Sequence, residues 1–260
     1  MQKSYIILFV LLLICIGCGW HYRNEDNAQD INMIDRYDLI EARFLTTGDV
    51  AALQQMNTDY PQQTRLLIED LLQLGHVNDS GINIKLYQYF QDTVLQKIVD
   101  DVALQYEDLS DVDLSLANAF EHMQQLLPDI KVPKVYTQIG SLDQSIIVGN
   151  DMLGISLDKY LGNDYPMYIR YGYSEMQRAS MNRFFIVPDC LGFYLLSLYP
   201  FHANSDSLQE VRDRHMGVIQ YIVNKSTGHD IFQNKFVDCV DKELQENPHL
   251  TIDQLLRRND

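Results

Sequence analysis

The sequence has little positive charge for its length. Its 260 residues include 20 Lys and Arg against 36 Asp and Glu, which gives a formal net charge of −16 at pH 7. Nucleic acids and anionic lipid surfaces are bound through basic faces, so this balance disfavours both as partners of the folded chain. Only 13 glycines and 7 prolines are present, too few for a collagen-like chain, whereas hydrophobic residues make up 46%. The composition indicates a globular domain and excludes coiled-coil and multi-span membrane architectures.

The signatures of common catalytic sites are also missing. None of the seven histidines has another histidine four residues away, so the sequence contains no zinc-peptidase helix. It contains no glycine-rich phosphate or dinucleotide loop. The stretch nearest to a serine-hydrolase elbow, residues 154–158, has Asp158 where the second glycine is required. We therefore expect no cofactor and no metal. The many acidic residues could contain a carboxylate pair of the glycosidase type, which the sequence does not locate.

The amino terminus has the pattern of a bacterial export signal. Lys3 precedes an apolar run, Tyr5 to Ile16, that ends in Gly17 and Cys18. As a helix this run would span about 18 Å, short of the roughly 30 Å hydrocarbon core of a membrane. The ending resembles a lipoprotein signal, in which the cysteine thiolate accepts diacylglycerol. We predict a signal peptide over 1–17 and lipid attachment at Cys18. Cys15 stands where such signals usually carry Leu, Val or Ile, and the alternative is an ordinary secretory signal.

The rest of the chain divides into a short tether and one domain. Residues 18–30 are polar and lack periodicity, which predicts a flexible tether, and residues 31–260 contain no break long enough for a linker between domains. Several acyl chains, palmitate among them, would hold the protein stably at a membrane. The expected location is the cell envelope, with the lipid anchor in the outer membrane.

The mature chain is predicted to have an α+β fold that is predominantly helical, with helices around a small central sheet near residues 134–161. The segments 134–140 and 145–149 are expected to pair as a hairpin, with a third strand over 155–161. Apolar periodicity predicts helices at 66–74, 95–106, 116–127, 191–198, 207–226, 232–244 and 251–258. The helices at 95–106 and 116–127 are expected to form an antiparallel pair. Cys190 and Cys239 lie in apolar helical patterns, so two buried thiols are favoured over a disulfide.

Several short motifs together carry a family resemblance. Residues 155–162 read Ile-Ser-Leu-Asp-Lys-Tyr-Leu-Gly, which resembles the I-x-x-G-L-D-x-Y-L-G run of the GldB-type gliding-motility lipoproteins of Bacteroidetes, with Ser156 in place of a glycine. Residues 35–38 resemble an early R-F-D element of that family, and residues 186–189 resemble its I-V-P-D step. The motif residues are Asp38, Asp158, Tyr160, Gly162, Pro188 and Asp189. With the lipoprotein start, they cover about the first 200 residues in the family's order.

The resemblance implies an envelope lipoprotein linked to gliding motility, which acts by contact with other envelope proteins and has no assigned catalysis. More remotely, the family resembles zinc peptidases in which a metal-binding helix follows a small sheet. That helix would start at Pro188, where residues 190–194 offer no ligand pair, so the resemblance implies a zincin-like fold without the metal motif. Asp189 would then cap the helix at 190–199, and Asp158 and Tyr160 would fasten the sheet. The alternatives are a peptide or glycan hydrolase with unassigned carboxylates, or a degenerate metallopeptidase-like module that binds a ligand.

Overall fold

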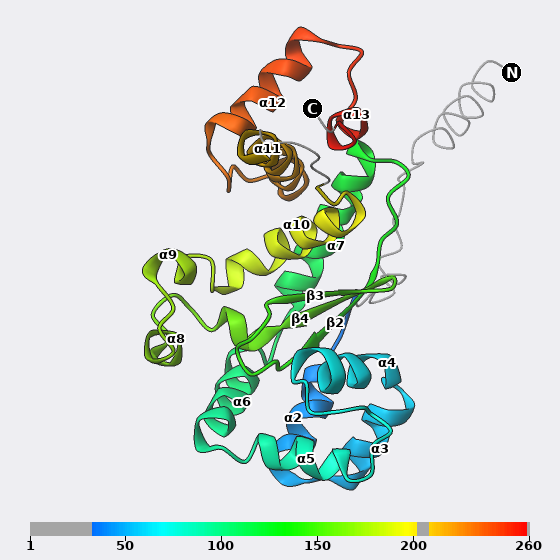
Figure 1. Cartoon of the computed structure of the whole chain (residues 1–260), viewed down its shortest axis with the longest axis vertical. Helices are drawn as coiled ribbons and strands as arrows, with labels where there is room; N and C mark the ends of the chain where they lie inside the picture. Colours follow the sequence, from blue (N-terminus) through cyan, green and yellow to red (C-terminus); the bar gives the residue numbers. More distant parts are fainter. Residues whose placement is uncertain (1–32, 202–207, 259–260) are drawn as a thin grey trace, which may run out of the picture. The chain divides into compact units, whose positions relative to one another are not determined.

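A small mixed sheet lies at the centre of the computed structural model, which describes residues 33–201 and 208–258 (Figure 1). Its strands are β1 (Ile34–Asp35), β2 (Lys134–Gln138), β3 (Ile146–Gly149) and β4 (Met152–Ser156), in the order β1-β2-β4-β3. β2 is parallel to both β1 and β4, whereas β3 and β4 are antiparallel. The predicted signal peptide, the tether and Cys18 lie outside the described residues.

The strand pairing differs from the expected hairpin. The segments at 134–138 and 146–149 are not neighbours, because β4 lies between them and pairs with both. β4 is buried along its whole length, which suits the central position. The predicted strand at 155–161 is also wrong beyond Ser156, since Leu157–Tyr160 form a short 3₁₀ helix, η3. The apolar–polar alternation there was misleading because Asp158 and Lys159 are themselves buried.

The first half of the chain supplies the helices on one side of the sheet (Figure 1). They are α2 (Tyr37–Thr47), α3 (Val50–Thr58), α4 (Pro61–Arg65), the π-helical η2 (Leu66–Leu71), α5 (Ile82–Tyr89) and α6 (Thr93–Gln105). α2 packs against β2 and contacts α3, α5 and α6. The helix predicted at 66–74 is realised as η2, which follows α4 directly and ends at Leu71.

The chain from residue 110 onward supplies the remaining helices, most of which lie on the other side of the sheet (Figure 1). They are α7 (Ser110–Leu126), α8 (Pro166–Arg170), α9 (Glu175–Arg178), η4 (Arg183–Phe185), α10 (Ile186–Leu198), α11 (Leu208–Thr227), α12 (Lys235–Glu246) and α13 (Ile252–Leu256). α10 packs against β3 and β4, and α7 and α11 pack against α10. The expected antiparallel pairing of the helices at 95–106 and 116–127 is wrong, because α6 packs against α2 and η3 whereas α7 packs against α10 and α11.

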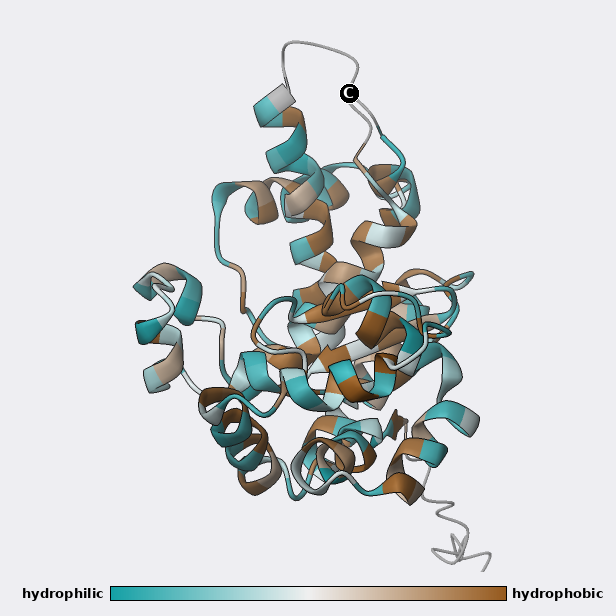
Figure 2. Ribbon diagram, turned by 60° about the horizontal axis from the view of Figure 1, so that its bottom comes forward, coloured by the Kyte–Doolittle hydropathy of each residue, from teal (hydrophilic) through white to brown (hydrophobic). Residues whose placement is uncertain are grey.

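Most helices pack against the core through an apolar stripe on one face. Figure 2 shows hydrophobic and hydrophilic residues alternating along most of them, as expected for helices with one face in the core. The α+β, mostly helical class is thus confirmed. Cys190 is buried, but Cys239 is an exposed free thiol, which corrects its predicted burial. Among the described helices, none has the length and hydropathy needed to cross a membrane.

Candidate functional site

Three carboxylates are buried where the parallel strands end. Asp38 and Glu41 come from α2, and Asp158 follows β4; their exposed fractions are 2%, 0% and 0%. α2 begins directly after β1, so its first turns lie beside the carboxyl ends of the strands. In parallel sheets this edge is where binding and catalytic residues commonly gather. Each carboxylate therefore has to be judged by its partners.

Asp158 binds the chain that leaves β2. Its Oδ1 accepts from the backbone N–H of Gly140 at 2.7 Å, and its Oδ2 accepts from that of Leu142 at 2.5 Å. Burial raises the pKa of Asp158, while these two amides and Lys159 oppose the shift. The carboxylate closes the loop after β2 and has both oxygens occupied by backbone donors.

Asp38 joins three segments of the domain. Arg36 donates to its two oxygens at 2.9 and 2.8 Å, and the hydroxyl of Thr137 on β2 donates to its Oδ1. Arg36 also donates to the backbone carbonyl of Tyr106 at 2.7 Å. This bidentate ion pair therefore ties β1 and α2 to β2 and to the end of α6.

Glu41 is the least satisfied of the three carboxylates. Its Oε2 accepts from the backbone N–H of Ile139 at 2.9 Å, but Oε1 has no hydrogen-bond partner among the described residues. The hydroxyl of Tyr136 and Oε1 of Gln138 are likewise buried without a partner. Burial, and then the charges of Asp158 and Asp38, raise the pKa of Glu41 well above its usual value. The side chain is fully enclosed, so it does not offer its carboxyl to a ligand from solvent.

Tyr160 connects the strand-end region to α10. Its hydroxyl donates to Asp189 Oδ2 at 2.8 Å. Burial raises the pKa of Asp189 to about 6, and the Tyr160 hydrogen bond opposes that rise. The prediction that Asp189 caps a helix at 190–199 is wrong: α10 starts at Ile186 with Phe185 as its N-cap, so Asp189 lies inside the first turns. The helix includes Pro188 because proline is tolerated in a first turn, where its missing N–H is not needed.

The remaining motif residues have different surroundings. Gly162 has φ +117°, a value that favours glycine, and its N–H donates to the Met181 carbonyl at 2.9 Å. Pro188 lies in the floor of a surface groove. The structure thus brings Asp38 and Asp158 to the strand ends and pairs Tyr160 with Asp189.

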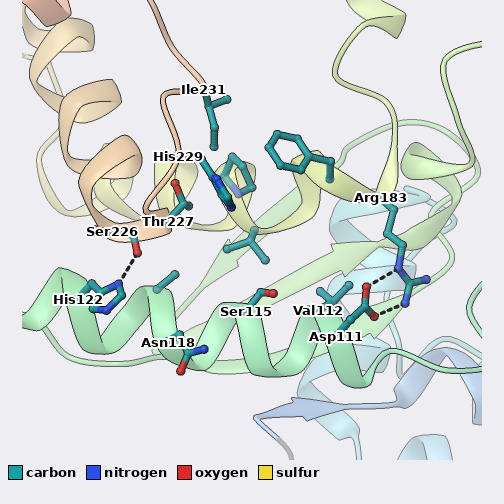
Figure 3. A pocket seen from close by; sticks show the side chains of 14 residues that line it. Asp111, Val112, Ser115, Asn118, His122, Arg183, Ser226, Thr227, His229 and Ile231 are labelled. Carbon is teal, nitrogen blue, oxygen red and sulfur yellow. Dashed lines mark hydrogen bonds and ion pairs between the residues drawn. The ribbon is translucent and has the colours of Figure 1, made fainter.

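The groove runs between α7, the start of α10 and the end of α11, and has a volume of about 560 Å³ (Figure 3). Its floor includes the buried side chains of Val112, Ala119, Val187 and Ser226. Figure 3 shows polar side chains of α7 along one wall, with His229 and Ile231 on the far side. The exposed ring of Phe184 stands at the rim, 5.9 Å from the His229 ring. A hollow of this size, with an apolar floor and a polar rim, is typical of a binding site.

The two charged side chains that line the groove, Asp111 and Arg183, form an ion pair with each other. Arg183 donates to both oxygens of Asp111, at 3.0 and 2.5 Å, and lowers the pKa of that carboxyl. The imidazole Nδ1 of His122 lies 2.9 Å from the Ser226 carbonyl, which can only accept, so Nδ1 donates to it. Ser226 Oγ is buried without a partner. The groove therefore offers apolar contact and neutral hydrogen-bonding groups.

Glu41, Phe184 and most of the groove were not identified from the sequence. A signal for Glu41 exists: the buried residues of α2 fall at 37, 38, 41, 44 and 45, so two carboxylates occupy positions of an apolar stripe. The groove joins residues from three separated segments, and no sequence spacing reveals it. Within 33–201 and 208–258, no group of three or more His, Cys, Asp or Glu side chains is placed to hold a metal ion.

Comparison with known proteins identifies the family. The model of the family described as gliding motility protein GldB matches residues 22–227. No curated protein and no solved structure matches the chain. The matched range includes the strand-end carboxylates, the Tyr160–Asp189 pair and α7 to α11, and it leaves α12 and α13 outside. Because the match spans more than half of the sequence, the chain belongs to the GldB family of gliding motility proteins.

Proposed function

We propose that the chain is an outer-membrane lipoprotein, anchored through Cys18, that works by contact with a partner envelope protein and not by catalysis. Family membership implies a lipoprotein associated with gliding motility and with the cell envelope. The observation that carries the proposal is the state of the strand-end carboxylates. A general acid or base must reach its substrate, whereas Asp158 and Glu41 are fully buried and bind backbone amides.

The groove of Figure 3 supports the contact role. Its apolar floor and its internally paired Asp111 and Arg183 suit a peptide segment with apolar side chains. In a chain with a net charge of −16, a surface without unpaired carboxylates is suited to contact. The proposed occupant is such a segment of a partner envelope protein.

Photo-crosslinking in intact cells tests the contact role. p-Benzoylphenylalanine placed at Phe184, which is 55% exposed at the groove rim, should capture a discrete partner. The matched control is the same group at Ile84, which is 62% exposed on α5. Identical products from both positions, or none from Phe184, would contradict the proposal. Hydrolysis of a peptide or wall glycan by the purified chain, abolished by Asp189→Asn, would favour the enzyme alternative.

Metabolic labelling with a palmitate analogue tests the anchor. The wild-type chain and Cys15→Ser should incorporate label and fractionate with the outer membrane, whereas Cys18→Ser should do neither. Cys15 is the appropriate control because it lies three residues away in the same segment. Label retained in Cys18→Ser would show that another residue carries the lipid, or that the anchor hypothesis is wrong.

A further inference from the structure

α10 contains a glycine that the fold does not require. Gly192 lies in the helix interior, where glycine costs about 1 kcal/mol relative to alanine. Its backbone is helical, and beyond its chain neighbours and the adjacent backbone of its own helix, no atom of the described residues lies within 4 Å of the position that a Cβ would take. At Gly154, by contrast, a Cβ would meet the Tyr136 hydroxyl at 2.5 Å. Neither backbone conformation nor close packing therefore accounts for Gly192, and the space above it is open.

That open space is a pocket of about 140 Å³ between α10 and α11. Its walls are mainly apolar and include Phe193, Leu196, Met216 and Ile219. Phe193 is 42% exposed at the entrance. Met216 adds a flexible, polarisable side chain of the kind that adapts to a bound group. The pocket therefore offers apolar contact to a group that enters from solvent.

Asp189 is the one charged residue among those that line the pocket. Its Oδ2 accepts the Tyr160 hydrogen bond, and its Oδ1 has no hydrogen-bond partner among the described residues. A carboxylate oxygen without a protein partner, in an apolar pocket that opens to solvent, favours the binding of a cation. Arginine binds carboxylates best through both oxygens, but Tyr160 occupies one of them. A lysine ammonium is a point charge that needs only the remaining oxygen.

We propose that this pocket binds a lysine side chain of the partner protein, with the alkyl stem along Phe193, Leu196 and Met216 and the ammonium at Asp189 Oδ1. Pro188 lines both this pocket and the groove of Figure 3, so the two hollows adjoin at the first turns of α10. The net charge of −16 favours a basic partner. The inference rests on the proposed function for the source of the lysine, whereas the pocket's preference for an ammonium can be measured independently.

Methyl NMR on the full-length lipoprotein in detergent measures that preference. With ¹³C-methyl methionine, the Met216 signal (assigned from Met216→Leu) reports on the pocket, and the other methionines report on the fold. n-Pentylammonium should shift the Met216 signal and bind about tenfold more tightly than n-pentanol. Asp189→Asn should remove this preference, and Gly192→Leu should abolish both responses by filling the pocket. Asp100→Asn, which removes the same charge from an exposed position on α6, is the control. An unresponsive Met216, or a preference that survives Asp189→Asn, would overturn the proposal.

Crosslinking identifies the source of the ammonium. p-Benzoylphenylalanine at Phe193 should capture a partner peptide that contains lysine, with a yield that falls severalfold when Asp189→Asn is added. An unchanged yield, with capture from Phe184 intact, would overturn the lysine site and leave the proposed function standing. Loss of capture from both Phe184 and Phe193 in the unsubstituted protein would overturn both.

Discussion

Asp158 at the strand ends and Asp189 on α10 differ in how many of their carboxylate oxygens are hydrogen-bonded. At the strand ends, Asp158 uses both oxygens to bind backbone amides and is fully buried. On α10, Asp189 has one oxygen without a hydrogen-bond partner among the described residues, and it lines a pocket that opens to solvent. A buried carboxylate with all its donors in place fastens the fold, whereas a carboxylate with spare capacity beside a cavity is available to a ligand.

Two glycines differ in a similar way: one is required by the packing of the domain and the other is not. Gly154 faces Tyr136 across the β2–β4 pair, and the tyrosine hydroxyl fills the space where a side chain would be. Gly192 faces open space. Packing within the domain requires glycine at position 154, whereas it does not require glycine at position 192. Residues that break a local preference without an internal reason are the ones to expect at functional sites.

The largest effect should come from removing the Asp158 carboxylate. Asp158→Ala leaves the amides of Gly140 and Leu142 buried without acceptors, so unfolding free energy should fall by about 4 kcal/mol. Urea denaturation followed by far-UV circular dichroism measures this. Asp189→Ala should have a smaller effect, because one hydroxyl is its hydrogen-bond partner. Equal losses of unfolding free energy in the two variants would contradict the distinction between a structural carboxylate at Asp158 and a ligand-binding one at Asp189.

Gly154→Ala should be the next most damaging change. The added Cβ would lie 2.5 Å from the Tyr136 hydroxyl and 2.6 Å from its Cζ, so the ring must move within a packed layer. Overpacking of this kind costs about 1–3 kcal/mol, which the same denaturation measurement would detect. A loss below about 0.5 kcal/mol would mean that the β2–β4 layer accommodates a side chain.

Local features were predicted well because their determinants lie within a few residues. The helix over α11 ends at Gly228, which has φ +71°, and Thr251 with Gln254 forms the capping box that opens α13. Both follow from backbone and hydrogen-bonding chemistry that the sequence displays directly. The family motifs likewise pointed to Asp158, Tyr160 and Asp189, although their contacts came only from the structure.

Non-local features were predicted poorly because sequence proximity does not determine them. β3 pairs with β4 and not with β2, since the fully buried β4 takes the centre of the sheet. The start of α10 was placed too late because Pro188 was taken as a boundary, whereas the helix begins two residues earlier. Glu41 was overlooked because a carboxylate in an apolar stripe looks like an interruption of it. Its meaning depends on Ile139, which is distant in the sequence.

Glu41 gives a pH-dependent prediction at the strand ends. Its pKa is raised in the folded state, so the stability linked to its bound proton is fully present below the unfolded pKa of about 4.3 and is lost as the pH rises through the folded pKa. Glu41→Gln should therefore stabilise the chain relative to wild type at pH 8. The wild type and the variant should converge near pH 4 in urea titrations. A variant that is less stable than wild type at pH 8 would show that the carboxylate form is needed.

The smallest expected effect separates stability from binding. Gly192→Ala should raise unfolding free energy by about 0.5–1 kcal/mol, because alanine favours the helix and its Cβ meets no atom within 4 Å. The same methyl narrows the pocket above Asp189, so pentylammonium binding at Met216 should weaken. A variant that gains stability while it loses binding cannot owe the loss to unfolding. If Gly192→Ala instead bound the ammonium as well as wild type does, the glycine would have no role in the pocket.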